Sequence, residues 1–426
     1  MKVAIVIFRN NLRIQDNPCL YHACKENDVV LGLYSFEDML LHQNYLGFKR
    51  YEVFKESFLK ESLINLEENL KNYGVNLSYT NSIKDSLLKL QKKYDLKLYF
   101  NEEVGVYEHN FEQFLKTYKY KSYFTQTMIE PFVFDYTKSF SHFRKKAQKQ
   151  EVSKPLGFPQ KVNTINFEGV SFKTPVITKL KGSISFKGGE NEAKKRLEEY
   201  MNFIHQYKDT RNAMLEFNNS SKFSPYLSFG TISPKTIYYR LKLQEEKTYE
   251  SQSSYWLYFE LLWRDFFHLV MRYSKNRLFL KTGLKGKLYN FRNDKNLLND
   301  FFMANTKVDL IDASINELKK TGWLSNRNRQ LVASYFVKNL GLDWRYCAAF
   351  FESYLVDYNP ASNYGNFAYQ AFVGNDKSYR VFDIMKQSNM YNGEQYVKYW
   401  LGKKEQIPKI DYVNLAKQVK KEVFSQ

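Results

Sequence analysis

The sequence predicts an α/β domain with a doubly wound parallel sheet over residues 1–130, an interdomain linker over 131–190 and an all-α domain over 191–426. Three observations lead to this prediction. Short apolar runs alternate with helical patterns at the start of the chain, which is typical of a parallel sheet covered on both faces. Prolines and small apolar clusters then replace the alternation. After Glu190 strand signals nearly disappear, and long amphipathic patterns favour helices.

Each element of the α/β domain follows from a local pattern. The predicted strands are five short apolar runs, at 3–8, 29–36, 77–80, 96–100 and 122–127. Predicted helices lie between them at about 48–73, 82–94 and 107–118, and another begins near Pro18, because proline is favoured in the first turn of a helix. No GxGxxG motif follows the first strand, so the ordinary dinucleotide-binding fingerprint is absent.

Composition narrows the classes of function. Lys and Arg exceed Asp and Glu by 19, so a polyanion such as nucleic acid is the first partner to consider. Aromatic residues make up 17% of the chain and suit stacking on bases or on a flat cofactor. An AT-rich genome, which raises Lys, Asn, Tyr and Phe, explains both biases equally well. The basic run at Arg144, Lys145, Lys146 and Lys149 is interpreted as a solvated face of the linker.

Other classes are excluded. Three cysteines are too few for a disulfide framework or an iron–sulfur cluster, and the six scattered histidines predict no metal site. The chain starts with too short an apolar run for a signal peptide, and no stretch reaches the roughly 18 apolar residues of a membrane span. We therefore expect a soluble, cytoplasmic monomer with no membrane partner.

Two predicted helices carry chemistry on one face. In Ser254–Ser274, the spacing places Glu260 and Arg264 on the same face as two tryptophans, Trp256 and Trp263. Charges among indoles indicate either a polar ligand in a cavity or an ion pair within the helix. The second helix, Ser325–Leu340, likewise groups four small or polar residues on one face, Asn326, Arg329, Gln330 and Ala333.

Two further segments are candidates for ligand contacts. Asn218–Pro225 carries three hydroxyls and a lysine directly before a helix that we expect to begin at Pro225, a pattern that suits a pyrophosphate but also an ordinary helix start. In Asp343–Gln370, a helix is predicted to end at Asp357, and a loop bearing Asn359 and Asn363 follows.

The chain resembles the photolyase and cryptochrome superfamily, and within it the DASH-type cryptochromes that act as photolyases on single-stranded DNA. Six ordered motifs carry the resemblance: FRNNLRIQDNPCL, SSKFSPYLSFGTISP, WLYFELLWRDFF, TGWLSNRNRQLVASYFVKNLGLDWR, DYNPASNYGNFAYQAFVGND and FDIMKQSNMYNGEQYVKYWL. It implies an α/β antenna domain and a helical domain that holds FAD in a U-shaped pose.

The resemblance also implies roles for individual residues. The implied phosphate and ribityl contacts of FAD are Tyr207, Ser220, Ser221, Lys222, Phe223 and Ser224. The residues implied between adenine, phosphate and lesion are Glu260, Trp263 and Arg264. Those implied around the isoalloxazine ring are Asn326, Arg329, Asp357, Asn359 and Asn363. Glu108, with Glu103 as a second candidate, is implied to bind the pterin of a methenyltetrahydrofolate antenna.

The implied reaction is blue-light-driven repair of cyclobutane pyrimidine dimers, in which excited, reduced FAD donates an electron to the dimer. Trp256 and Trp263 are implied to stack on the dimer, and Glu260 to bond its thymine edges. The family's tryptophan relay is present only at Trp344, because phenylalanine stands at Phe367 and Phe291, so slow photoreduction is expected.

Three functions compete at this point. The first is a photolyase for dimers in single-stranded or looped DNA. The second is a blue-light signalling photoreceptor without relevant repair, which the short segment after YVKYWL disfavours. The third is a basic nucleic-acid-binding protein with a merely structural flavin, which the complete set of implied site residues disfavours.

Overall fold

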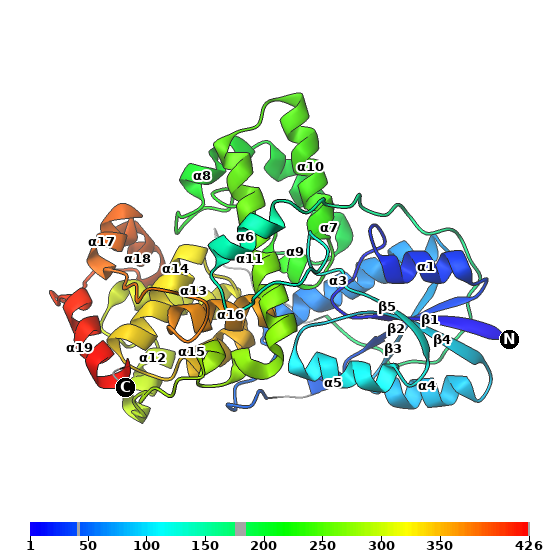
Figure 1. Cartoon of the computed structure of the whole chain (residues 1–426), viewed down its shortest axis with the longest axis horizontal. Helices are drawn as coiled ribbons and strands as arrows, with labels where there is room; N and C mark the ends of the chain where they lie inside the picture. Colours follow the sequence, from blue (N-terminus) through cyan, green and yellow to red (C-terminus); the bar gives the residue numbers. More distant parts are fainter. Residues whose placement is uncertain (41–42, 175–184, 425–426) are drawn as a thin grey trace.

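The computed structural model describes residues 1–40, 43–174 and 185–424, and shows an α/β part and a helical part side by side (Figure 1). The α/β part holds one sheet of five parallel strands in the order β3-β2-β1-β4-β5. The strands are β1 (Lys2–Phe8), β2 (Val30–Ser35), β3 (Asn76–Thr80), β4 (Asp95–Asn101) and β5 (Lys119–Tyr123). The chain winds outward from β1 in one direction and then from β4 in the other, so the topological switch point lies between β1 and β4.

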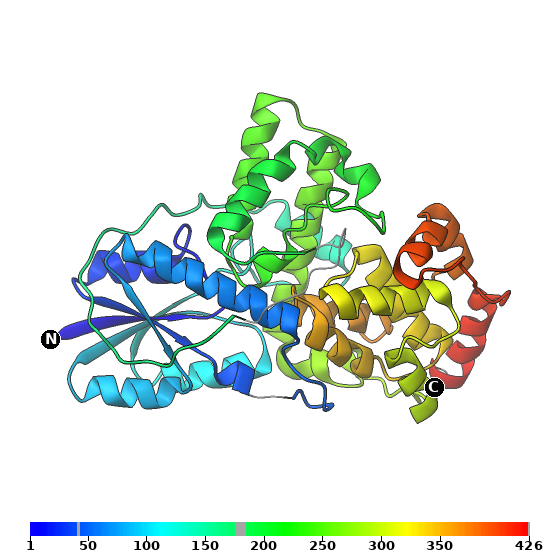
Figure 2. The ribbon, with the colours of Figure 1, turned by 180° about the vertical axis from the view of Figure 1, so that it is seen from behind.

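Apolar side chains point alternately to the two faces of the sheet along β1, so both faces need to be covered. Val3, Ile5 and Ile7 join one apolar core with α4 (Ile83–Gln91) and α5 (Val106–Leu115). Ala4, Val6 and Phe8 face the opposite way and join the core that continues into the helical part. That second face is covered by α1 (Pro18–Glu26) and α3 (Val53–Lys71), and the short α2 (Glu37–Leu40) follows β2 (Figure 2).

The fifth strand differs from the prediction of 122–127, because β5 ends at Tyr123. Its sequence, KYKSY, is polar and largely exposed at the edge of the sheet, so it lacks the apolar run that marks the buried strands.

Helix α6 (Phe140–Ala147) lies in the described part of the predicted linker and packs against the helical part. Lys145, Lys146 and Lys149 are exposed, in agreement with a solvated face, whereas Arg144 is half-buried over the Phe259 ring. Residues 175–184 of the predicted linker lie outside the described residues.

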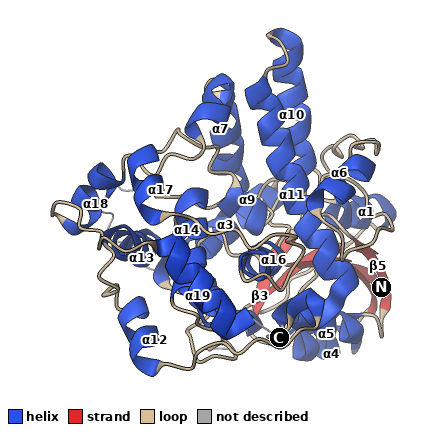
Figure 3. Cartoon of the chain, turned by 60° about the vertical axis from the view of Figure 1, so that its left-hand side comes forward, coloured by secondary structure: helices blue, strands red, loops and turns tan. Residues whose placement is uncertain are grey.

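From Glu190 onward the described regular elements are helical (Figure 3). They are α7 (Glu190–Met201), α8 (Tyr207–Thr210), α9 (Ser224–Ser228), α10 (Pro234–Lys247), α11 (Gln252–Ser274), α12 (Lys295–Phe302), α13 (Asp309–Thr321), α14 (Asn326–Ser334), α15 (Trp344–Tyr354), α16 (Pro360–Gln370), α17 (Ile384–Met390), α18 (Gly393–Leu401) and α19 (Tyr412–Phe424). The predicted fold class is confirmed. Within the described ranges, no helix combines the length and the hydropathy needed to cross a membrane.

The helix predicted over Ser325–Leu340 is divided, because α14 ends at Ser334 and a π-helical turn, Tyr335–Asn339, continues it. Helix α16 approaches α11 closely at Gly365, where an added Cβ would clash with the Phe267 ring. This close approach brings the polar face of α16 next to α11 and α14, where the main cavity of the helical part opens.

Candidate functional site

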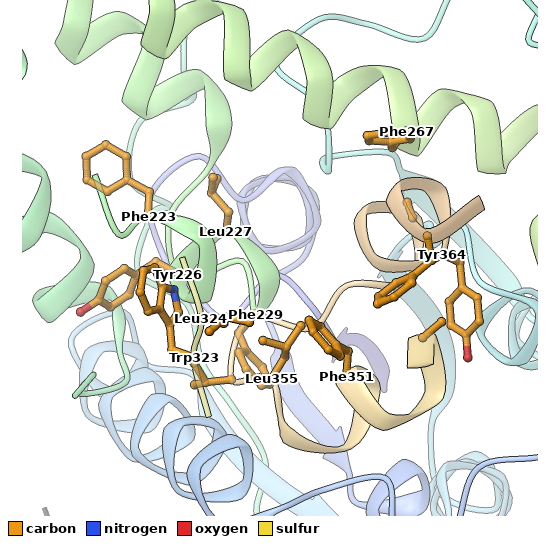
Figure 4. Close-up of a cluster of buried hydrophobic side chains, with 14 of the residues drawn as sticks. Phe223, Tyr226, Leu227, Phe229, Phe267, Trp323, Leu324, Phe351, Leu355 and Tyr364 are labelled. Carbon is orange, nitrogen blue, oxygen red and sulfur yellow. The ribbon is translucent and has the colours of Figure 1, made fainter. Parts of the chain in front are cut away.

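A cavity of about 480 Å³ opens between α8, α9, α11, α14 and α16, within the size range of ligand pockets. A smaller one of about 90 Å³ adjoins it, and both are lined by Arg329 and Asp357. Figure 4 shows the apolar side chains of this region: Phe223, Leu227, Phe267, Trp323 and Leu324 line the larger cavity, and Phe351 and Leu355 the smaller.

The Ser220–Ser224 segment forms one wall of the larger cavity. Lys222 has a left-handed backbone (φ 57°), and its ammonium lies 2.8 Å from Ser220 Oγ and 4.2 Å from the centre of the Trp323 ring. Burial lowers the pKa of Lys222 to about 7. Arg196 fixes the segment from behind by donating to the Ser221 carbonyl oxygen at 2.9 Å. Helix α9 begins one residue before Pro225, so Pro225 is in its first turn as expected.

All six implied phosphate and ribityl contacts line this cavity: Tyr207, Ser220, Ser221, Lys222, Phe223 and Ser224. The structure therefore brings residues from two separate segments of the sequence to one cavity. Their role in binding remains a prediction.

Arg329 and Asp357 form the ion pair that joins the two cavities. Arg329 Nη2 donates to Asp357 Oδ2 at 2.8 Å, and Nε donates to the Leu324 carbonyl oxygen at 2.8 Å. Asp357 does not end a helix, because α15 stops at Tyr354 and Asp357 lies in the turn that follows. Its other oxygen, Oδ1, is buried and has no hydrogen-bond partner, and such a group is costly unless a ligand donates to it.

Asn363 lies near the start of α16 and not in a loop, whereas Asn359 is the extended residue directly before this helix. Asn359 caps this helix by accepting from Ser362 N at 3.2 Å, and Pro360 follows it, so Asn-Pro is a helix start here. Asn363 Nδ2 donates to the Ala348 carbonyl oxygen at 2.9 Å. Both asparagines line the smaller cavity together with Asn326.

Glu260 forms an ion pair with Arg211 and not with Arg264, so the alternative prediction of an ion pair within the helix is wrong. Arg264 also lines the larger cavity, and its guanidinium donates to the carbonyl oxygens of Gln126, which follows β5, and of Leu227 in α9. Burial raises the pKa of Glu260, and Arg211 opposes that shift. Sequence reasoning missed Arg211, although its position four residues after Tyr207 places both on one side of a helical turn.

The two tryptophans of α11 differ in position. Trp263 lines the larger cavity; one ring face stacks on Phe140 of α6 at 3.8 Å between centroids, and its edge meets Tyr369 at 5.8 Å. Trp256 is not among the residues that line the cavity, and the Arg211 guanidinium covers its ring at 4.4 Å. The implied stacking of Trp256 on a ligand is therefore not supported by its position.

The relay positions are embedded in aromatic packing. Trp344 is fully buried and meets Tyr364 edge-on at 6.2 Å, while Phe367 lines the smaller cavity. The Tyr364 hydroxyl donates to Glu352 Oε2 at 2.9 Å. Phe291, implied at the surface end, is only 8% exposed.

The switch-point crevice at the ends of β1 and β4 is filled by the chain itself. Glu103 is buried, and its two oxygens accept from Asn10, Asn101 and Gln126. Its carboxylate is thus already used inside the fold and does not fit the pterin of a folate. Glu108 is half-buried in the first turn of α5. A folate antenna at Glu108 remains a prediction.

The larger cavity, by contrast, fits the FAD that the resemblance implies. It combines flat apolar walls with the hydroxyls and the ammonium of the Ser220–Ser224 segment, and it leaves Asp357 Oδ1 without a partner. An elongated ligand with a hydrogen-bonding ring at one end and phosphates in the middle satisfies both groups.

Comparisons with known proteins agree with this architecture. The family described as DNA photolyase matches residues 4–159, and the one described as FAD binding domain of DNA photolyase matches residues 256–424, so FAD is the cofactor. Cryptochrome DASH of Synechocystis sp. is 33% identical over 95% of this chain and 88% of its own. The chloroplastic/mitochondrial Cryptochrome DASH of Arabidopsis thaliana is 35% identical over 96% of this chain and 77% of its own.

Solved structures extend the agreement to three dimensions. The crystal structure of a Synechocystis sp. cryptochrome superposes with a TM-score of 0.93 at 30% identity, covering 99% of each chain. An archaeal photolyase from Sulfolobus tokodaii, solved with two FAD molecules, gives 0.80 at 25% identity, again over 99% of each chain. With two matching families and relatives alike along almost its whole length, this chain belongs to the photolyase/cryptochrome family, among the DASH cryptochromes.

Proposed function

We propose that this protein repairs cyclobutane pyrimidine dimers by a blue-light-driven reaction, preferentially in single-stranded or looped DNA. One observation carries the proposal. A single cavity is lined on one side by Asn326, Arg329 and Asp357, and on another by Glu260 and Trp263. A cofactor held by the first set and a substrate held by the second would therefore share one cavity.

When bound in its reduced form, FAD would donate an electron to the dimer under blue light and regain it after the ring has opened, with no net change of oxidation state. The chain's own residues hold and shield it. The Ser220–Ser224 segment, with Lys222, offers hydroxyls and an ammonium to the phosphates. Arg329, fixed by Asp357 at 2.8 Å, supplies a cation that stabilises negative charge on a bound ring.

The other side of the cavity suits an extruded pair of bases. The Trp263 ring is fixed from behind by Phe140 and offers its remaining face to a base, a contact typical of single-strand recognition. Glu260 and Arg211 form a polar edge that exchanges hydrogen bonds with pyrimidine edges. Damaged bases pair weakly and cost the least to extrude, which favours a dimer over intact bases.

Positive charge supports a DNA substrate. Five arginines line the cavity, Arg211, Arg264, Arg327, Arg329 and Arg380, and the whole chain carries a net charge of +19. Arginines at a cavity mouth neutralise the phosphates that flank an extruded nucleotide, so binding should weaken steeply with salt. The preference for single strands rests on the likeness to the DASH cryptochromes.

The test measures thymine-dimer loss under blue light, by chromatography, with chemically reduced protein and single-stranded, looped or duplex oligonucleotides. We expect light-dependent loss on the first two substrates. Glu260→Gln should impair repair while FAD stays bound, because this carboxylate contacts substrate in the proposal. Glu246→Gln removes the same charge from an exposed position of α10 and should leave repair unchanged.

Loss of FAD from Glu260→Gln would assign Glu260 to the cofactor instead. FAD and DNA binding without dimer loss on any substrate would overturn repair in favour of a signalling photoreceptor. Equal affinity for damaged and intact strands would favour a plain binding protein. We also propose that the protein acts in the cytoplasm as a monomer, which light scattering of the purified protein tests for the assembly state.

A further inference from the structure

One wall of the larger cavity is the stretch between α16 and α17, residues 371–383, which we call the wall segment. It contributes Asp376, Arg380 and Phe382 to the lining. It has no helix or strand of its own. Its position therefore depends on individual contacts from neighbouring elements.

The first half of the wall segment is anchored by backbone and amide contacts. The Val373 carbonyl oxygen accepts from Leu284 N at 2.9 Å. Asn375 Nδ2 donates to the carbonyl oxygens of Tyr136 and Lys138 at 2.6 and 3.0 Å. This half is thus tied to the linker and to the turn after α11.

The second half depends on a buried lysine. Lys338 Nζ donates to the Arg380 carbonyl oxygen and lies 5.2 Å from the centre of the Tyr379 ring. The backbone bond from Arg380 N goes to Ser378 O, inside the wall segment itself. Lys338 is therefore the side chain that ties the backbone of Arg380 to the rest of the domain.

The surroundings of Lys338 are unfavourable for a charge. Its side chain is 1% exposed, and its hydrogen bonds in the described part of the chain go to neutral oxygens. Of the charges that act on it, the Asp376 carboxylate favours the ammonium and the Arg380 guanidinium opposes it. Burial lowers the pKa of Lys338 to about 8. A methionine would occupy the same space without desolvating an ammonium, so this residue contributes something other than stability.

The backbone around Lys338 is also unusual. It lies in the π-helical turn Tyr335–Asn339, and π-turns inside helices are frequent at functional sites. Lys338 Nζ is in addition 3.5 Å from Oε1 of Gln370, a cavity-lining residue at the end of α16. One ammonium thus connects two parts of the cavity wall.

Arg380 is the residue whose backbone is held in place by this hydrogen bond from Lys338. Its side chain is exposed at the cavity mouth, and Nε donates to Ser378 Oγ at 3.1 Å. Within the described ranges this guanidinium forms no ion pair. Its guanidinium is therefore available to an anion at the mouth of the cavity.

We propose that Lys338 is a positioning residue for DNA binding. By fixing the carbonyl of Arg380, it holds the wall segment so that the Arg380 guanidinium meets a phosphate of the strand whose nucleotides enter the cavity. This inference rests on the proposed function for the identity of the strand. The placement of the wall segment by Lys338 does not depend on it.

The first measurement is hydrogen exchange of the FAD-bound protein without DNA. In Lys338→Met, amides of residues 377–382 should exchange about tenfold faster, because one hydrogen bond from a charged donor is lost. Lys377→Met is the matched control, since it removes the same charge from an exposed neighbour in the wall segment. It should leave exchange of these amides unchanged.

The second measurement is a double-mutant cycle on the binding of a dimer-bearing single strand in the dark. Arg380→Met should lower affinity and make the log–log salt slope shallower by about 0.7, the value for one single-strand phosphate. Lys338→Met should shift both in the same direction. In the Arg380→Met background it should change neither, because its effect passes through Arg380.

Unchanged exchange in Lys338→Met, or effects of Lys338 and Arg380 that simply add, would overturn the proposal. Where Lys338→Met fails to retain FAD, Lys338→Gln replaces it; its shorter side chain does not reach Arg380, so the same faster exchange is expected. A wild type that binds no strand would overturn the proposed function and the phosphate contact. The exchange result still decides separately whether Lys338 holds the wall segment.

Discussion

Two of the places where buried polar side chains gather differ in how those groups are satisfied. At the switch point of the sheet, Glu103 accepts from three side-chain amides of its own domain. In the helical part, Asp357 is equally buried but one of its oxygens has no partner. At the switch point the carboxylate itself is satisfied as folded, although Oε1 of the neighbouring Gln126 has no partner, whereas the Asp357 carboxylate becomes satisfied only with a ligand.

Whether each oxygen has a partner distinguishes a buried carboxylate that stabilises the fold from one that binds a ligand better than residue type does. Both carboxylates follow a regular element, β4 or α15, and both are implied cofactor contacts by resemblance. A buried acceptor without a donor lowers the stability of the empty protein by about 1 to 3 kcal/mol. Binding recovers that free energy, so an unpaired group in a cavity indicates where a cofactor lies.

The largest expected effect comes from removing each carboxylate in turn. Asp357→Ala leaves Arg329 without its anion in the cavity, and loss of one partner of a buried pair costs about 3 to 5 kcal/mol. We therefore expect FAD affinity to fall at least about 100-fold, measured as FAD retained per protein after dialysis. Glu103→Ala should lower the free energy of unfolding by about 1 to 3 kcal/mol while FAD content stays unchanged.

The opposite pattern would break the comparison. Full FAD retention in Asp357→Ala would mean that the unpaired oxygen is not a cofactor contact. Loss of a second chromophore from Glu103→Ala would mean that the switch-point crevice is a binding site after all. Asp343→Asn, which breaks the ion pair with Arg345 but keeps an N-cap side chain on α15, is the control for both.

The second effect concerns proton uptake at Lys222. Its pKa lies near 7 in the empty cavity and at 10.5 in an exposed lysine, so above pH 7 the folded protein binds fewer protons there than the unfolded chain. Stability from this group therefore rises between about pH 7 and 10. FAD phosphates would favour the ammonium, so FAD affinity should fall above pH 7, by at most about tenfold per pH unit.

Calorimetric titration of FAD in buffers of different ionisation enthalpy measures this uptake directly. We expect uptake of close to one proton above pH 7 in the wild type and none at this site in Lys222→Met. An affinity that is independent of pH between 7 and 9 would place the phosphates away from Lys222.

Much of this site could be predicted from the sequence, and the misses have physical reasons. Motif residues such as Ser220 and Arg329 line the cavity, because short-range patterns fix which side chains share a helix face, while their roles stay predictions. The partner of Glu260 was missed, since Arg211 comes from another element and pairing across elements leaves no periodic signal. Asn363 lies in a helix and not in the predicted loop, because an Asn-Pro helix start resembles a loop. Asp357 lies in a turn and not at a helix end, because α15 already stops at Tyr354.

The third effect concerns the edge of the cavity at Phe367. Phenylalanine is much harder to oxidise than tryptophan, so we expect light-driven reduction of bound FAD to be slow. Phe367→Trp should accelerate this reduction several-fold. The measurement is the loss of flavin absorbance under light with an external thiol as the electron donor. Tyr364→Phe should slow it further if Tyr364, hydrogen-bonded to Glu352, is an alternative donor. Rapid reduction that neither variant changes would contradict this account. Repair by chemically reduced protein should be the same in all three.

The smallest expected effect lies in the linker, which joins the two regions. Phe140 of α6 stacks on Trp263 at 3.8 Å, so it fixes the ring that we propose meets the substrate. Phe140→Leu keeps most of the buried area but removes the aromatic pair, worth about 0.5 to 1.5 kcal/mol. Affinity for a dimer-bearing strand should therefore fall about 2- to 10-fold, while affinity for an intact strand, which does not occupy the cavity, should stay the same. Phe158→Leu, at an exposed linker position, is the control. An equal loss of affinity for both strands would show that Phe140 acts on the general DNA surface and not through Trp263.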